Sequence, residues 1–216
     1  MQSWGTRSRF GYRETEREPS KSGVLGLLCA ALGVPREDDE ALARLSVMPM
    51  GVRVNREGTV ASDFQTVGAG RLGGGAYGVA RADGGHGAVI LSRRDYLADA
   101  DFLVGLADAD EARLRGLDAA LRAPVWPLCL GRRSYVPGVC PAVGVVGGSL
   151  PEALAAASYP LAGAAPEDGL RLILEAPGGD GQVCYDVPVS FDHERRRFRR
   201  RTVTVSILSA ERVGRA

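Results

Sequence analysis

A short polar stretch near the start of the chain has the residue types that bind an anion. Glu18-Pro19-Ser20-Lys21-Ser22-Gly23 precedes an apolar run and opens a predicted helix. The first backbone N–H groups of a helix have no partner within it, so they attract negatively charged groups. Lys21, the only lysine of the chain, adds a positive charge at this point. We therefore predict that Lys21 and Ser22 bind a phosphate.

A second candidate is the basic loop Gly131-Arg132-Arg133-Ser134-Tyr135. It combines a flexible glycine, two guanidinium groups, a hydroxyl and an aromatic ring, which are the groups that recognise RNA phosphates and stack on bases. An ordinary basic surface turn has the same composition, and the sequence alone does not separate the two interpretations.

The third candidate is the run from residue 195 to residue 201, which has six arginines around Phe198. In a strand, alternate residues point to opposite faces, so about half of the run faces one way. The run fits RNA contact, and it fits equally a solvated strand edge or a charged hairpin tip, which protects a strand from aggregation.

Catalytic and metal-binding patterns are weak in this chain. The four cysteines (Cys29, Cys129, Cys140 and Cys184) form no CxxC pair, and the two histidines are far apart, so we expect no metal and no cofactor. Cys29 lies in an apolar helix, where we expect a core residue. The GxGxxG match at residues 68–73 lacks the helix that a dinucleotide site requires, and we interpret it as accidental.

Bulk composition limits the function classes. The 216 residues are 45% hydrophobic, enough for a packed core, and the net charge is only +1. Nucleic-acid binding therefore has to come from local clusters of arginines. No apolar run approaches the ~20 residues that span a bilayer, so we expect a cytoplasmic protein with reduced thiols and no membrane partner.

The periodicity of apolar residues predicts alternating helices and strands. Helices are expected at residues 23–32, 37–45, 108–122 and, with Ser149 as N-cap, 150–157. Strands are expected at residues 46–55, 59–67, 88–91, 100–107, 170–176, 183–189 and 202–208. We expect the first two strands to form a hairpin through Arg56-Glu57-Gly58. Nine glycines in residues 68–87 suggest an extended hairpin arm at about residues 63–94. This order predicts an α+β fold and fits a ferredoxin-like βαββαβ unit whose first strand is missing from this chain.

Three sequence blocks resemble a known family in the same order. They are Met1-Gln2-Ser3-Trp4-Gly5 with Glu18-Pro19-Ser20-Lys21-Ser22-Gly23-Val24-Leu25-Gly26-Leu27-Leu28, then Arg94-Asp95-Tyr96-Leu97-Ala98-Asp99-Ala100-Asp101-Phe102, and Pro127-Leu128-Cys129-Leu130-Gly131-Arg132-Arg133-Ser134. They resemble CasD-type proteins, which are subunits of Cascade, the subtype I-E CRISPR surveillance complex. The resemblance covers about residues 1–140.

The resemblance implies a single ferredoxin-like (RRM-like) domain over residues 1–216. The arm at about 63–94 would be its thumb, and about 140–216 a less regular, β-rich part. The implied role is non-catalytic: the subunit binds and caps the 5′ handle of the CRISPR guide RNA. Its partners would be the Cascade backbone subunits, the large subunit and, indirectly, target DNA. Family members begin with an apolar strand ahead of the Gln2–Gly5 block, so we expect such a strand upstream of residue 1.

The predicted RNA-binding residues follow from these candidates. They are Lys21, Ser22, Arg132, Arg133 and Ser134, with Arg9, Gln65 and Arg94 placed near the base of the arm. Two alternatives remain open. One is a metal-independent endoribonuclease that processes repeat RNA, for which Lys21, Tyr96, Tyr135 and His193 are available. The other is a protein–protein adaptor with incidental basic patches.

Overall fold

The structure is a computed structural model that describes residues 1–7, 11–67, 71–72, 75–76, 79–80, 86–87, 90–160, 166–176 and 178–214. Within these ranges the chain has four α helices and two larger β sheets, which confirms the α+β class. The helices are α1 (Lys21–Leu32), α2 (Asp39–Ser46), α3 (Glu111–Arg122) and α4 (Leu150–Ala156). Among the described residues, none of these helices is long and apolar enough to cross a lipid bilayer.

The helix ends have clear local causes. Ser20 caps α1 by accepting a hydrogen bond from the Gly23 N–H, and α1 ends at Gly33, whose φ of 71° favours glycine. Asp38 caps α2 and Asp110 caps α3 in the same way. These carboxylates therefore accept hydrogen bonds from backbone N–H groups, as expected for acidic residues at helix starts.

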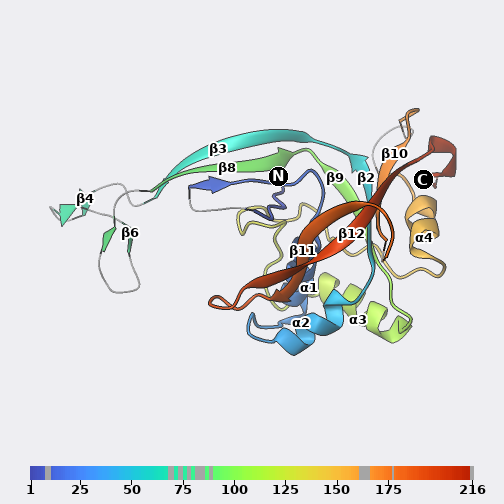
Figure 1. Cartoon of the computed structure of the whole chain (residues 1–216), viewed down its shortest axis with the longest axis horizontal. Helices are drawn as coiled ribbons and strands as arrows, with labels where there is room; N and C mark the ends of the chain where they lie inside the picture. Colours follow the sequence, from blue (N-terminus) through green and yellow to red (C-terminus); the bar gives the residue numbers. More distant parts are fainter. Residues whose placement is uncertain are drawn as a thin grey trace.

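A five-stranded antiparallel sheet forms the body of the molecule, in the order β11-β12-β10-β2-β9 (Figure 1). Its strands are β2 (Met50–Arg56), β9 (Asp101–Leu106), β10 (Leu170–Glu175), β11 (Gln182–Ser190) and β12 (Arg197–Leu208). All five fall on predicted strands. β12 begins earlier than predicted, because most of the arginine run belongs to it. A short 3-10 helix, Ala210–Arg212, follows β12.

Strand β2 is buried on both faces of this sheet. Met50, Val52 and Val54 pack in one apolar cluster with Val24 of α1. The alternate residues face α4, and a Cβ added at Gly51 would lie 2.7 Å from the Leu154 side chain. The alternation of a strand places these two sets on opposite faces. The helix α4 can approach β2 closely because position 51 has no side chain.

Arg53 also points from β2 toward α4, and it is fully buried. Its guanidinium donates to the backbone oxygens of Leu154, Ala157 and Ser158 at 2.6 to 3.0 Å, and Nε donates to Asn55 at 2.8 Å. Carbonyl groups at the end of a helix lack internal partners and carry partial negative charge. Arg53 therefore caps the C-terminal end of α4 and fixes this helix on the sheet. Burial lowers the pKa of its guanidinium.

The predicted arm is a long antiparallel hairpin that projects from the body (Figure 1). It consists of β3 (Thr59–Val67) and β8 (Ile90–Ala98), paired from Thr59↔Ala98 to Val67↔Ile90. The hairpin thus begins nearer the body than residues 63–94. β1 (Tyr12–Arg13) adds to β8 in parallel. Short strands lie farther along the arm: β4 (Arg71–Leu72), β5 (Gly75–Ala76), β6 (Val79–Ala80) and β7 (His86–Gly87).

The expected hairpin between β2 and β3 is wrong. β2 pairs with β9 and β10 in the body, whereas β3 pairs with β8 in the arm. Gly58 makes this change of sheet possible, because its φ is +71° and a Cβ there would lie 2.5 Å from the Ala98 oxygen. The GxGxxG glycines, Gly68, Gly70 and Gly73, lie outside the described residues.

The order α1-β2-β9-α3, with the arm inserted between the two strands, matches the helix–strand–strand–helix part of the predicted unit. β9 is an edge strand of the sheet. Gln2 forms an antiparallel bridge with Leu97, next to the turn that leads from β8 into β9. The ferredoxin-like arrangement and the additional first strand both stay predictions.

Cys29 lies in the apolar cluster shared by α1, α2 and α3, as expected for a core residue. Burial, and then the charge of Asp38, raises the pKa of its thiol to about 11. A thiol in an unfolded chain has a pKa of about 8.5. The contribution of Cys29 to stability is therefore complete below pH ~8.5 and is lost as pH rises toward 11.

We predict that alkylation at mildly alkaline pH distinguishes the cysteines of the native protein. Cys140 is exposed and should react first, whereas Cys29 should react only after unfolding. Mass spectrometry of timed iodoacetamide reactions measures both rates, and a Cys140→Ser variant should lack the fast phase. Equal rates at Cys29 and Cys140 would contradict the buried position of Cys29.

Candidate nucleic-acid interface

The root of the arm brings together arginines from three separate segments. Arg13 of β1 lies opposite Arg94 of β8. The Arg132 guanidinium donates a hydrogen bond of 2.9 Å to the backbone oxygen of Arg13. Two predicted residues, Arg94 and Arg132, thus both lie next to Arg13. The sequence analysis did not single out Arg13.

The loop that carries Arg132 is fixed by a turn and by aromatic packing. The Tyr135 N–H donates to the Arg132 oxygen at 2.9 Å, and the Arg132 guanidinium lies 5.7 Å from the centre of the Tyr135 ring. Gly131 has a φ of 86°, and a Cβ there would collide with the Ser3 backbone oxygen. Tyr135 is buried and packs against Tyr96, so its ring does not offer the base-stacking surface that the loop composition suggested.

The other predicted residues near this root differ in exposure. Arg133 and Ser134 are exposed, and Gln65 is exposed on β3 opposite Ser92. Arg94 is half-buried, and its Nε donates to the Ser92 hydroxyl at 3.2 Å. Arg9 lies outside the described residues. Arg94, Arg132 and Arg133 therefore provide positive charge at one place, with Gln65 farther out on the arm.

Asp95 is the buried anchor beneath this surface. Its carboxylate accepts hydrogen bonds of 2.5 Å from the hydroxyls of Tyr12 and Ser62, and its backbone oxygen accepts one from Ser3. The bond from Ser62, and then the bond from Tyr12, holds the pKa of Asp95 below its ordinary value. Asp95 therefore joins β1, β3, β8 and the N-terminal segment.

Lys21 lies in the interior instead, and only 2% of its surface is exposed. Its Nζ donates to the Met48 oxygen at 2.7 Å and lies 2.9 Å from a Glu175 oxygen. Its backbone N–H donates to the Asp186 carboxylate at 2.7 Å. Ser22 is half-buried, with its hydroxyl 3.4 Å from that of Ser20. The anion at the start of α1 is thus Asp186 of the chain itself, which corrects the prediction of a phosphate there.

Arg201 completes this buried network. Its guanidinium donates to both Asp186 oxygens, at 2.7 and 2.8 Å, and to Glu175 at 3.1 Å. Two cations therefore face two carboxylates, while burial lowers the pKa of Lys21. Asp186 and Glu175 were not predicted as partners. The sequence signal that could have identified such a partner is a carboxylate within an apolar strand, because a buried charge requires a partner of opposite charge.

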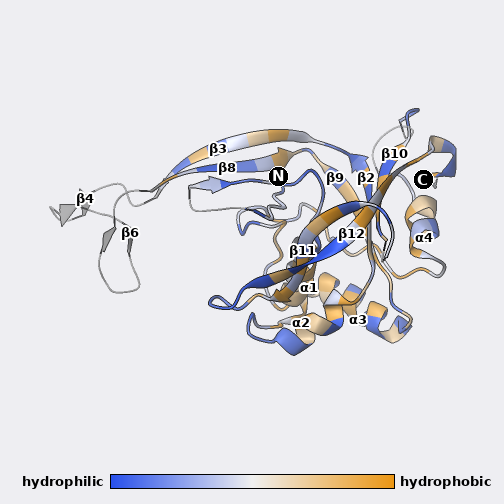
Figure 2. Ribbon diagram, viewed as in Figure 1, coloured by the Kyte–Doolittle hydropathy of each residue, from blue (hydrophilic) through white to orange (hydrophobic). Residues whose placement is uncertain are grey.

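The remaining arginines of the 195–201 run fall into different environments. Arg195 pairs with Asp192 at 2.8 Å. The Arg196 guanidinium lies 5.2 Å from the centre of the Phe198 ring. Arg197, Arg199 and Arg200 are exposed. Figure 2 shows the resulting hydrophilic half of β12, next to its connection with β11. The run is therefore partly structural and partly exposed surface, and RNA contact by its exposed members stays a prediction.

The four residues considered for RNA cleavage do not assemble in the described structure. Tyr96 contacts Tyr135, Lys21 bonds to Met48 and Glu175, and His193 lies in the exposed connection between β11 and β12. Among the described residues, no group of three or more His, Cys, Asp and Glu side chains could hold a metal ion.

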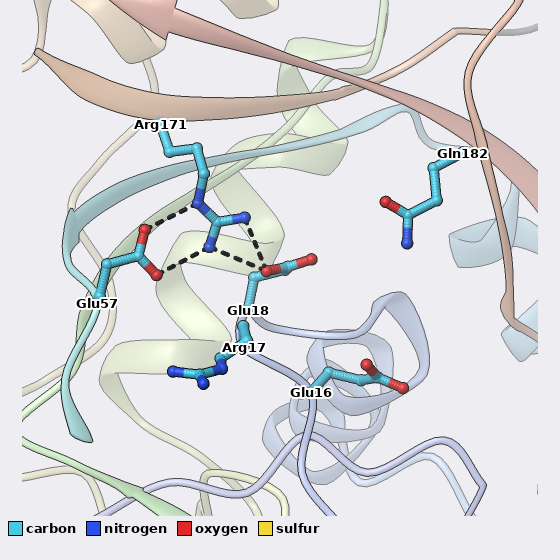
Figure 3. A pocket seen from close by; sticks show the side chains of 6 residues that line it. All are labelled: Glu16, Arg17, Glu18, Glu57, Arg171 and Gln182. Carbon is cyan, nitrogen blue, oxygen red and sulfur yellow. Dashed lines mark hydrogen bonds and ion pairs between the residues drawn. The ribbon is translucent and has the colours of Figure 1, made fainter. Parts of the chain in front are cut away.

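A shallow pocket lies on another part of the surface (Figure 3). Its lining has three carboxylates, two arginines and an amide: Glu16, Arg17, Glu18, Glu57, Arg171 and Gln182. Arg171 donates to Glu57 at 2.8 Å and to Glu18 at 3.1 Å. These ion pairs join β10 to the segment before α1 and to the turn after β2, so we interpret the pocket as structural.

Comparison with known proteins identifies the family. A family model described as "CRISPR-associated protein (Cas_Cas5)" matches residues 1–204. The chain belongs to the Cas5 family. This confirms the resemblance noted in the sequence.

Individual relatives support the assignment. The chain is 36% identical to the CRISPR system Cascade subunit CasD of Escherichia coli (strain K12) over 149 residues, which span 62% of each chain. A solved structure titled "Crystal structure of Cas protein" matches with a TM-score of 0.78 and 41% identity, and covers 100% of this chain and 93% of that one. A chain of a "CRISPR RNA-guided surveillance complex" matches with a TM-score of 0.80 and 36% identity, over 97% of this chain and 86% of that one.

We predict that Lys21→Met destabilises this Cas5 family member by about 3 kcal/mol, because the change removes one partner from a buried ion network. Urea unfolding measures the loss. RNA affinity measured where the variant is folded should equal that of the unchanged protein. Arg44→Gln is the matched control, because it removes an exposed pair with Glu40 and should have little effect. Native stability combined with weaker RNA binding would instead return Lys21 to a phosphate-binding role.

We predict that Asp95→Asn lowers the free energy of unfolding by about 2 kcal/mol at neutral pH, because charged hydrogen bonds are lost. The lowered pKa means that this stability is present above pH ~4 and is lost as the carboxylate is protonated. The difference between the two proteins should therefore shrink below pH ~4. Unfolding curves over pH test this, with the exposed turn residue Asp99 changed to Asn as control. A difference that persists in acid would contradict it.

Proposed function

We propose that this protein is a non-catalytic subunit of a CRISPR RNA-guided surveillance complex and that it binds and caps the 5′ handle of the guide RNA. The observation that carries the proposal is the root of the arm, where Arg94, Arg13, Arg132 and the exposed Arg133 come together beside a projecting hairpin. The name of the relative CasD, a Cascade subunit, supports the assignment to such a complex.

The arrangement suits a contact with the RNA backbone. Guanidinium groups make paired hydrogen bonds to phosphate oxygens, and such contacts dominate the affinity for nucleic acids. Arg132 is held in one orientation by Tyr135 and by the Arg13 carbonyl, so little side-chain freedom is lost on binding. We infer that the guide RNA itself reads the target sequence and that this subunit holds its handle.

Protein partners are proposed on a different surface. Residues 123–148 form no helix or strand, and Val136, Val139, Val143 and Val146 are each at least 69% exposed. The sequence has no charged residue from 134 to 151. Exposed apolar side chains in such number mark contact surfaces. We propose that backbone subunits or the large subunit cover this segment. The same surface favours a protein–protein adaptor as the second candidate function.

We predict that the tagged protein, purified from its host, carries RNAs with one shared 5′ handle ahead of varied spacers, together with several protein subunits. Arg132→Gln with Arg133→Gln should weaken handle RNA binding by about tenfold or more. The slope of log affinity against log salt should fall by about 0.7 for each lost phosphate contact. Sequencing of RNA 5′ ends and fluorescence anisotropy measure these results.

The matched control is Arg113→Gln with Arg115→Gln on α3, which removes the same charge from side chains paired with Asp108 and Glu111. This control should bind RNA normally. Arg133→Gln alone is a second variant that should stay folded, since Arg133 is exposed. Absent or mixed RNA with intact protein partners would favour the adaptor function. An equal loss of RNA affinity in the control would mean that the arm root is not the RNA-binding site.

A further inference from the structure

One face of the arm presents two aromatic rings with a guanidinium between them. Tyr12 of β1 lies opposite Arg93 of β8, and Arg93 lies opposite Phe64 of β3. Residues opposite each other in neighbouring strands point to the same face, so these three side chains form one row across the sheet. The Arg93 guanidinium lies 5.8 Å from the centre of the Tyr12 ring. We call Tyr12, Arg93 and Phe64 the ring row.

The opposite face of the same strands has a different chemistry. Arg13 lies opposite Arg94, and Gln65 lies opposite Ser92. Because side chains alternate along a strand, these polar residues point away from the ring row. The guanidinium groups that we propose to contact the RNA backbone thus lie on one face of the arm, and the rings lie on the other. Figure 1 shows β1 beside β8, the two strands that contribute to both faces.

The ring row is exposed, and it is only partly occupied by contacts within the chain. Phe64 is 70% exposed, and Tyr12 is also exposed. The Nε of Arg93 donates to the Ser62 hydroxyl at 3.0 Å and lies 3.5 Å from an Asp95 oxygen. Both contacts use Nε, and they leave the two terminal nitrogens to an acceptor from outside. Arg93 is therefore held in place while most of its side chain stays exposed.

The alignment of these groups indicates what they bind. Exposed apolar side chains that occur singly are common and need no function. Here two rings and a cation share one row, and Leu91, which is exposed two residues before Arg93, points to the same face. Aromatic rings and guanidinium planes are the surfaces on which unpaired nucleobases stack. Adjacent strands lie about 4.8 Å apart, so one planar base can cover the Phe64 ring and the Arg93 guanidinium together.

We propose that the ring row binds an unpaired base of the RNA, with Phe64 as the stacking ring and Arg93 as the hydrogen-bond donor. This inference rests on the proposed function and extends the same interface to the second face of the arm. Arg13 directly follows Tyr12 in sequence, and Arg94 directly follows Arg93. The proposed phosphate contacts and the rings are thus one residue apart along both strands, within reach of a single RNA strand.

The test uses the full chain and two labelled single strands of equal length, an oligoadenylate and a ribose-phosphate strand without bases. Phe64→Leu keeps an apolar side chain but removes the ring, so it should weaken oligoadenylate binding by about five- to fiftyfold. The slope of log affinity against log salt should stay unchanged, because a base contact releases no counterions. The strand without bases should bind both proteins equally. Anisotropy titrations at several salt concentrations measure these values.

Two further variants serve as controls. Phe64→Tyr keeps a ring at the same position and should retain the affinity of the unchanged protein. Tyr185→Leu is the matched control, because it removes a ring of similar exposure, 66%, from β11 of the body. It should bind both strands normally. Phe64 is exposed, so its variants should fold, and a thermal melt without RNA checks this.

Three results would overturn the proposal. The first is equal affinity of Phe64→Leu and the unchanged protein for oligoadenylate. The second is an equal loss on the strand without bases or in Tyr185→Leu. The third is a loss of protein subunits when Phe64→Leu is purified from its host, combined with normal oligoadenylate binding, which would assign the ring row to a protein partner.

These outcomes separate the two proposals. If the purified protein carries no common 5′ handle but Phe64→Leu still weakens binding of oligoadenylate alone, the base-binding position stands and the capping function fails. If the handle RNA is present but Phe64→Leu binds oligoadenylate normally, the capping function stands and the ring row is not part of its RNA path.

Discussion

The carboxylate of Asp186 at the start of α1 is the interaction on which the arrangement of the body depends. A helix beginning in the interior leaves N–H groups that need an acceptor, and β11 supplies one. Arg201 and Lys21 balance Asp186 and Glu175, so one neutral network joins α1, β10, β11 and β12. Because Lys21 and the helix start are both occupied internally, an external anion must be bound by other cations.

Pairing decides which arginines are available to a partner. Arg171, Arg195 and Arg201 are each bonded to carboxylates, whereas Arg13 and Arg133 form no ion pair with any described residue. The net charge of +1 averages over these two classes and does not report their separation in space. A nearly neutral chain can therefore present a locally positive surface, because many of its carboxylates pair with other arginines or lie at helix starts.

Local chemistry explains how much could be predicted. Caps at Ser20, Asp38 and Asp110 and the alternation of β2 place the helices and strands, because these signals act within a few residues. The partners of β2 could not be found in this way, since strand pairing depends on residues about fifty to one hundred and twenty positions away. The same limit applies to Lys21: its positive charge and helix start are visible in the sequence, but Asp186 and Glu175 approach only in the fold. The glycine-rich stretch indicated the arm, and the composition of the basic loop indicated Arg132, whereas Arg13, in a two-residue strand, has no periodic signal.

The arm and the proposed RNA-binding face share one foundation. A two-stranded hairpin is marginally stable alone in water, so β3 and β8 require support from the body. That support comes from β1 and from Asp95, whose carboxylate binds Tyr12, the neighbour of Arg13. Arg132 then fixes the Arg13 backbone from the other side. A displacement of the arm would therefore move Arg13 relative to Arg132 and disturb the arginines of the arm root. The position of the arm and the arrangement of the arginines that we propose to bind RNA are thus coupled through a single short strand.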